Sequence, residues 1–145
     1  MAKVSYTVKS DLPPQVVWEA LTEFGPRRSE LWPDLSPSFK VRERGEGYAV
    51  VRESTDSLGI WAVERYEWSY PVVTATVQDS NAAQPGGMWR TEVQPGPNGG
   101  SVLTIHMDRK ARGFVGHAIH AVFQVTNGRF LAARTRKMLS NIRRS

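Results

Sequence analysis

One stretch near the C-terminal end constrains the fold of this chain more than any other. From residue 114 onward there is no proline, and apolar side chains recur at helical spacing as one broad stripe. The pattern predicts a helix of up to about thirty residues. A bend is expected near Gly128, because glycine inside a helix costs roughly 1 kcal/mol and often marks a kink. The stripe consists of Phe114, Val115, Ala118, Ile119, Val122, Phe123, Phe130 and Ala133.

The rest of the chain offers strands against which such a helix can pack. Apolar and polar residues alternate in several segments, and this period of two is typical of a strand with one buried face. Glycine-rich and proline-rich turns separate the later segments, with the strongest hairpin signal at residues 95–100. An antiparallel sheet of seven strands is therefore predicted. The segments are 4–8, 39–42, 48–53, 58–68, 73–77, 88–93 and 103–107.

Two short helices are predicted between the first and second strands. Ser10 provides a capping hydroxyl, and Pro14 supplies a φ angle suited to a first helical turn. A second short helix is expected at 27–32, between Pro26 and Pro33. The resulting order predicts an α+β fold in which a curved antiparallel sheet wraps around the long C-terminal helix. Such a sheet leaves space on its concave side.

Composition limits the chemistry that the chain can carry. It has 145 residues, 40% of them hydrophobic and 23% charged, which suits one globular domain spanning residues 1–145. There is no cysteine, so disulfides, thiolate metal sites and cysteine nucleophiles are excluded. No run approaches the roughly 20 apolar residues that span a bilayer, and the start lacks the apolar stretch of a secretory signal. We therefore expect a cytoplasmic protein without a transmembrane segment.

The net charge of +5 raises the question of an anionic partner. The densest basic group lies at the C-terminal end, where helical geometry scatters the charges over several sides and where cations complement the helix dipole. No aromatic residues interleave with this group, as single-stranded nucleic acid binding usually requires. A solvated face is favoured, and no nucleic-acid partner is expected. The group consists of Arg129, Arg134, Arg136, Lys137, Arg143 and Arg144.

Several short motifs follow one another in a recognisable order and spacing. They are the opening strand followed by Leu12-Pro13-Pro14-Gln15-Val16-Val17-Trp18, the Trp32-Pro33 pair, Tyr66-Glu67-Trp68 with Pro71 beyond, and Gly99-Gly100-Ser101. In these features the chain resembles the superfamily of START, polyketide cyclase/dehydrase and pathogenesis-related plant proteins, over nearly its whole length. The resemblance implies a helix-grip fold with a deep cavity between sheet and helix. Relatives use that cavity for lipids, sterols, polyketides, quinones or aromatic metabolites, and a minority are cyclases or aromatases.

The walls of the implied cavity are predicted as strand and helix faces, because this superfamily has no fixed binding motif. The alternation in 58–68 independently turns the same side chains inward as the resemblance does. Trp32 is expected at the mouth, whereas Trp61 lies on the opposite face and is expected at the surface or in a homodimer interface. The predicted ligand-binding residues are Trp32, Phe39, Ile60, Ala62, Glu64, Tyr66, Trp68, Ala75, Val77, Trp89, Ile105, Met107, Phe114, Ala118 and Val122.

Glu64 interrupts the apolar inner face of its strand. A carboxylate facing an apolar cavity is costly unless it is paired, protonated or bound to a ligand. An ion pair with Arg52 or Arg90 on a neighbouring strand is the favoured explanation. The alternative is a polyketide cyclase or aromatase in which Glu64 and Tyr66 act as acid and base.

The three histidines are expected at the surface. His117 and His120 stand three residues apart on the long helix, a spacing that can hold a metal, and His106 lies on the preceding strand. None falls on the apolar stripe and no third ligand has a recognisable spacing, so neither a metal nor a cofactor is expected. Without a histidine on the inner faces, non-catalytic binding of a small hydrophobic molecule is favoured over cyclisation.

Overall fold

Seven strands form one antiparallel sheet, as predicted. The computed structural model describes residues 2–32, 35, 39–55, 59–126 and 128–144. The strand order across the sheet is β1-β7-β6-β5-β4-β3-β2, so only β1 departs from sequence order, by pairing with the last strand. The strands are β1 (Ala2–Ser10), β2 (Lys40–Gly45), β3 (Tyr48–Thr55), β4 (Ile60–Ser69), β5 (Val72–Ser80), β6 (Met88–Pro95) and β7 (Ser101–Arg109).

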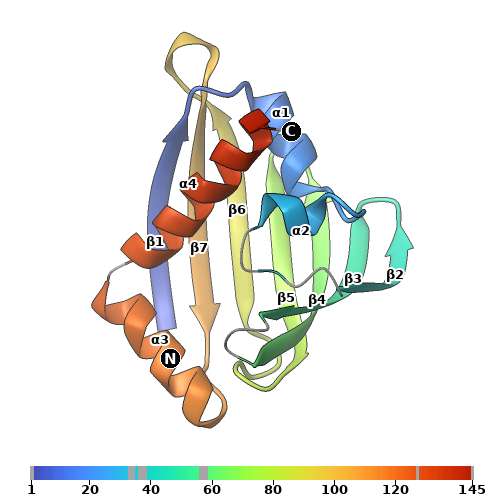
Figure 1. The fold of residues 1–145 in the computed structure, drawn as a ribbon, viewed down its shortest axis with the longest axis vertical. Coiled ribbons are helices and arrows are strands. Elements are labelled where there is room, and N and C mark those ends of the chain that lie inside the picture. The colour runs from blue at the N-terminus through green and yellow to red at the C-terminus, as the bar shows by residue number, and fades with distance from the viewer. Residues whose placement is uncertain (1, 33–34, 36–38, 56–58, 127, 145) are drawn as a thin grey trace.

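Four α-helices accompany the sheet, and α1, α2 and α4 lie over one of its faces (Figure 1). The two short helices follow β1, as expected, and the C-terminal helical segment crosses in front of β1 and β7. A 3-10 turn, η2 (Pro97–Gly99), closes the predicted hairpin between β6 and β7. The helices are α1 (Pro14–Leu21), α2 (Arg28–Leu31), α3 (Gly113–Val125) and α4 (Arg129–Arg144).

The main core lies between the helices and the β1–β7–β6 part of the sheet. Val8 of β1 faces Leu103 of β7, and both side chains are fully buried. Met138 of α4 is also fully buried, in the same cluster as Val17 of α1. This arrangement follows from the two periods in the sequence, because each strand and each helix brings one apolar side to a shared interior.

The predicted bend at Gly128 is where the C-terminal helical segment divides into α3 and α4. Gly128 has a φ angle of 83°, which side chains with a Cβ rarely adopt. A Cβ added there would also lie 2.9 Å from Cγ1 of Val4. Since the chain changes direction at this residue, the inward faces of α3 and α4 are set independently of each other.

A β-bulge shapes the far end of β5. Val63 pairs with Asp79 and Glu64 pairs with Val77, which leaves Gln78 as the extra residue. Beyond the bulge the faces of β5 exchange, so Ser80 is buried opposite Ala62. This exchange turns the end of β5 and the following residues towards the concave side of the sheet.

Candidate functional site

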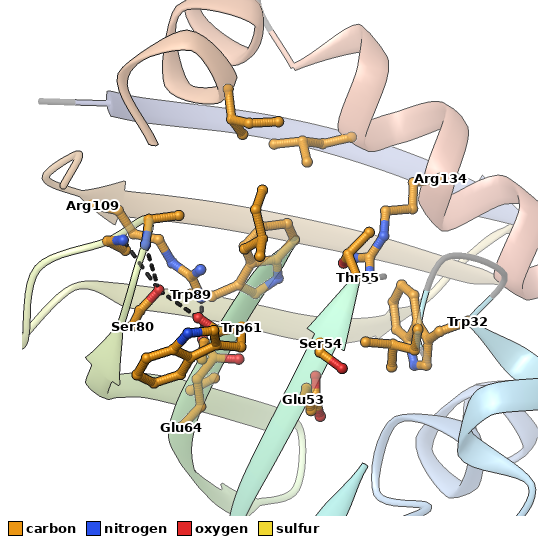
Figure 2. Close-up of a pocket in the computed structure, with 18 of the residues that line it drawn as sticks. Trp32, Glu53, Ser54, Thr55, Trp61, Glu64, Ser80, Trp89, Arg109 and Arg134 are labelled. Atoms are coloured by element: carbon orange, nitrogen blue, oxygen red, sulfur yellow. Dashed lines mark hydrogen bonds and ion pairs between the residues drawn. The ribbon is translucent and has the colours of Figure 1, made fainter. Parts of the chain in front are cut away.

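A cavity of about 230 Å³ lies between the concave face of the sheet and the helices (Figure 2). Its walls come from β3 to β7, from α1 and α2, and from both halves of the C-terminal helical segment. The volume exceeds the roughly 150 Å³ of a cavity that holds benzene, but it is below the roughly 300–1,000 Å³ typical of drug-sized ligands. The space is therefore large enough for a molecule of at least one ring.

The sheet side of the cavity contains many of the residues predicted for it. Side chains at four alternate positions of β4, from Ile60 to Tyr66, reach the space, as the period of two requires. The predicted residues that line the cavity are Trp32, Ile60, Ala62, Glu64, Tyr66, Ala75 and Trp89.

Other predicted wall residues on the sheet side belong to the packed core instead. Trp68 stacks on Phe24 with ring centroids 5.3 Å apart, and Phe39 packs against the same cluster. Val77, Ile105 and Met107 are almost completely buried and do not line the cavity. These positions have the predicted inward direction, but helices and neighbouring side chains already cover them.

The predicted helix face is corrected by the structure. Phe114 is 89% exposed, and Ala118 and Val122 are also exposed, so these three residues do not line the cavity. Ile119, His120 and Phe123 take that place. The prediction assumed one continuous helix with a single apolar face. Because the helix is broken at Gly128, a different side of α3 faces the cavity.

His120 is a second correction, since it was expected at the surface. It is buried with only 7% of its surface exposed, and its ring stacks against Phe123 at 5.8 Å. Burial lowers the pKa of His120 to about 4, with a further contribution from the charge of Arg109. The imidazole is therefore neutral at physiological pH. His106 and His117 are exposed, as expected, and contact Ser5 and the Gly113 carbonyl.

One buried ion pair joins α2 to β3. Arg28 Nε donates to Glu53 Oε1 at 2.8 Å, and Arg28 Nη1 donates to the carbonyl of Glu23 at 3.3 Å. The guanidinium also lies over the rings of Phe24 and Tyr66, at 4.4 and 4.9 Å from their centroids. Burial disfavours the charge of Arg28, but Glu53 and Tyr66 outweigh it and raise its pKa. This arginine therefore stays charged inside the protein.

A second ion pair joins β4 to the end of β7. Arg109 Nη2 donates to Glu64 Oε1, which confirms that Glu64 is paired and corrects the expected partner. Arg52 instead lies over the ring of Trp61, and Arg90 pairs with Glu92 at 3.4 Å. β4 and β7 are not neighbours in the sheet, so this contact depends on sheet curvature.

Tyr66 connects the two ion pairs. Its hydroxyl lies 3.2 Å from Glu53 Oε2 and 3.2 Å from Glu64 Oε2, and its single proton is shared between them. Burial raises the pKa of Tyr66 well above its usual value, and both carboxylates add to the rise. Tyr66 is therefore a protonated donor that holds the two carboxylates, and not a base.

Three buried nitrogen atoms of cavity residues have no hydrogen-bond partner among the described residues. They are Trp32 Nε1, Arg109 Nε and His120 Nδ1. Buried polar groups are normally satisfied, and an unmade hydrogen bond costs about 1–3 kcal/mol. Figure 2 shows Arg109 towards one end of the cavity and Trp32 towards the other, where the Arg134 guanidinium lies 4.7 Å from the Trp32 ring.

Trp61 differs from its expected position at the surface or in an interface. It is half-buried and lines the cavity beside Glu64 and Ser80 (Figure 2). The backbone of Trp61 is held by Asn81, whose Oδ1 accepts from its N–H at 2.9 Å, and by the Ser80 hydroxyl at 2.8 Å. At the start of β4, side chains from both faces of the strand therefore contribute to the rim of the cavity.

Sequence reasoning missed four polar residues that shape the cavity. Glu53 follows Ala49 and Val51 on the inner face of its strand, so the alternation that identified Glu64 would also have found it. Arg28 and Arg109 had no comparable signal, because one lies in a four-residue helix and the other ends a strand. His120 needed the correct register of α3.

The chain belongs to the family described as polyketide cyclase / dehydrase and lipid transport, whose model matches residues 1–144. No curated protein matches the chain in sequence. Within the described residues, no helix is long and apolar enough to cross a membrane, and no three acidic or histidine side chains gather as metal ligands do.

Solved structures share the helix-grip fold at low sequence identity. The Zhui aromatase/cyclase from Streptomyces sp. R1128 is 18% identical with a TM-score of 0.74, and the match covers 98% of this chain and 93% of that one. A START superfamily protein from Mycobacterium smegmatis is 12% identical with a TM-score of 0.72, covering 95% and 99%. The human StarD13 lipid transfer and protein localization domain is 16% identical with a TM-score of 0.65, covering 97% and 76%. These likenesses establish the fold.

Proposed function

We propose that the protein binds and carries a compact, largely apolar ring compound in the cavity between the sheet and the helices. The cavity itself is the observation that carries this proposal, because about 230 Å³ is walled mainly by aromatic and aliphatic side chains. Burial of apolar ligand surface supplies the binding free energy, at roughly 25 cal/mol per Å². The family's association with lipid transport and polyketides supports the same class of ligand.

The ligand proposed here also carries a hydrogen-bond acceptor such as a carbonyl or phenol oxygen. Arg109 Nε can only donate, and it is buried without a partner at the edge of the cavity. His120, neutral and close to Arg109, offers a second polar atom on the helix side. A small rotation of either side chain towards a ligand oxygen removes the penalty of an unmade hydrogen bond.

A cyclase or aromatase remains the alternative function, supported by the fold shared with an aromatase/cyclase. The arrangement of the two predicted acid–base residues disfavours a cyclase or aromatase. Glu64 is already paired with Arg109, and the proton of Tyr66 is already donated to carboxylates. The raised pKa of Tyr66 makes its hydroxyl both a weak acid and an unavailable base at neutral pH.

The cavity is tested by filling it with one side chain. Ala62 lines the cavity from β4, whereas Ala118 lies on the exposed side of α3. Isothermal titration with naphthol should show that Ala62→Trp weakens binding by about tenfold or more, because the indole occupies the ligand's space. The matched Ala118→Trp variant should bind like the wild type.

Circular dichroism identifies variants that fail to fold, which are then replaced by the smaller Ala62→Leu. A folded Ala62→Trp protein with wild-type affinity would remove the cavity as the binding site. Incubation of the wild type with aromatic polyketide substrates, followed by mass spectrometry, tests the alternative. Conversion that Glu64→Gln abolishes without loss of affinity would establish the cyclase instead.

A further inference from the structure

Helix α3 has two apolar faces, and the described residues cover only one of them. Ile119, His120 and Phe123 turn inward and line the cavity. On the other side Phe114 is 89% exposed and Val125 is 85% exposed. An apolar helix surface is normally buried, so the outer face of α3 is a surface that lacks its partner in the isolated chain.

The exposed side chains form one continuous stripe. At 3.6 residues per turn, positions 114, 118, 121, 122 and 125 fall on neighbouring lines along one side of the helix, and 115 lies at its edge. Beyond the break, Phe130 is 52% exposed and its ring lies 6.1 Å from that of Phe123. We call this surface the outer stripe of α3. It consists of Phe114, Val115, Ala118, Ala121, Val122 and Val125.

The charged residues that flank the outer stripe along the chain are all basic. Helix α3 itself has no charged residue, but Lys110 and Arg112 precede it and Arg129 follows it, all exposed. Residues 109–145 contain nine Lys and Arg and no Asp or Glu, whereas residues 1–108 contain ten basic and 14 acidic residues. The basic charge is therefore concentrated in the segment that carries the stripe. Nearby carboxylates offset it only partly, with Asp79 at 3.4 Å from Arg112.

We propose that the outer stripe of α3 docks on the surface of a membrane that contains anionic lipids. An uncharged apolar stripe between clusters of cations matches such a surface, where aliphatic and aromatic side chains enter the headgroup region and Lys and Arg face lipid phosphates. A second copy of the chain fits less well. A symmetric dimer through this stripe would bring two sets of cations together with no acidic residue of 109–145 to neutralise them.

Docking through this helix has a consequence for the cavity. The inner face of α3 is a wall of the cavity, so the same thirteen-residue helix would touch the bilayer with one side and the bound molecule with the other. An apolar compound dissolved in the membrane would then lie one helix thickness from the binding site. The docking inference stands on the outer stripe and its charges, and it does not require the proposed ligand.

The test uses flotation of the full chain with two kinds of vesicle, one of phosphatidylcholine and one of an equal mixture with phosphatidylglycerol. The wild type should bind the mixed vesicles and leave the neutral ones essentially free. Phe114→Ser with Val125→Ser should lower the partition coefficient by about tenfold or more, because two exposed apolar groups no longer enter the interface. Val41→Ser with Tyr70→Ser removes two apolar side chains elsewhere on the surface, where these residues are 37% and 53% exposed, and should bind like the wild type.

The charge contribution has an equally matched control. Lys110→Gln with Arg129→Gln should lower binding to the mixed vesicles by roughly tenfold, whereas Arg42→Gln with Arg44→Gln removes the same charge from exposed β2 and should change it little. If both double variants lost vesicle binding equally, the effect would come from net charge alone, and this would overturn the proposed docking surface. The naphthol affinity of the Phe114→Ser, Val125→Ser variant should equal that of the wild type. This measurement distinguishes loss of membrane docking from loss of ligand binding in the cavity.

Two further outcomes would overturn the proposal. One is absence of wild-type binding to the mixed vesicles. The other is a dimer, measured by light scattering, that dissociates in the Phe114→Ser variant, since a second copy would then be the partner of the outer stripe.

Discussion

The two arginine–glutamate pairs on either side of Tyr66 differ in how completely they are satisfied. Arg28 is in contact with Glu53, a backbone carbonyl and two aromatic rings, and only 5% of its side chain is exposed. Arg109 is 16% exposed, borders the cavity and keeps Nε without a partner. The same pair of residue types is thus held by several partners at one place and keeps an unpaired donor beside the cavity at the other.

The largest expected difference concerns stability. Arg28→Met should lower the free energy of unfolding by about 3–5 kcal/mol, because Glu53 would remain buried without its cation. Arg109→Met should lower it by only about 1–3 kcal/mol, since Tyr66 still contacts Glu64 and the cavity adjoins it. Urea unfolding of both variants measures the two losses. Equal losses would contradict the distinction between a structural and a ligand-directed pair.

A double variant separates lost charge compensation from lost packing. Arg28→Met with Glu53→Leu should recover a large part of the stability lost by Arg28→Met alone, because no unpaired carboxylate remains. If the double variant were as unstable as the sum of the single ones, packing of Arg28 against Phe24 and Tyr66 would be the main contribution.

Ligand affinity should reverse the order of the two arginines. Arg109→Met should weaken binding of naphthol by about tenfold or more and leave binding of naphthalene nearly unchanged, because only naphthol has an oxygen that accepts a hydrogen bond. Titration calorimetry of both compounds gives this comparison directly. Equal weakening for the two compounds would show that Arg109 acts through the shape of the cavity and not through its unpaired nitrogen.

The pH dependence of stability tests the environment of His120, which lies near Arg109. The pKa of His120 is about 4 in the folded protein and about 6.5 in an unfolded chain, so between these values the unfolded state binds more protons. Stability should therefore be complete above pH 6.5 and decrease as the pH falls towards 4, by about 2 kcal/mol after allowance for solvent screening. Unfolding of wild type and His120→Phe across this range isolates the contribution. An unchanged slope in the variant would mean that other groups cause it.

The sequence predicted the sheet side of this site better than the helix side, for a physical reason. A strand has a period of two that β4 keeps without interruption, so Ile60, Ala62 and Glu64 share a face whatever the tertiary packing. The predicted direction of a helix face becomes less accurate along the helix, because small errors in the angle per residue add up. The positive φ of Gly128 also changes the direction of the chain, so the wall contains His120 where Phe114 was predicted.

The partners of buried charges were beyond prediction from local patterns. Glu64 was recognised as needing a cation, but Arg52 on the neighbouring β3 and Arg90 on β6, two places away, lie on the other face of the sheet. Its partner, Arg109, comes from the end of β7, three positions away across the sheet order. The curvature of the sheet brings the end of β7 close to Glu64 in the middle of β4, and this curvature depends on the bulge in β5 and on the helices packed inside.

The smallest predicted effect tests whether Tyr66 couples the two ion pairs. Tyr66→Phe keeps the ring against Phe24 but removes the proton shared by Glu53 and Glu64, and should lower the free energy of unfolding by about 1 kcal/mol. In this background the effects of Arg28→Met and Arg109→Met should become additive, because the hydroxyl no longer links their carboxylates. A double-mutant cycle measures the coupling with and without the hydroxyl. Coupling that survives in Tyr66→Phe would mean that the two pairs interact directly through their charges.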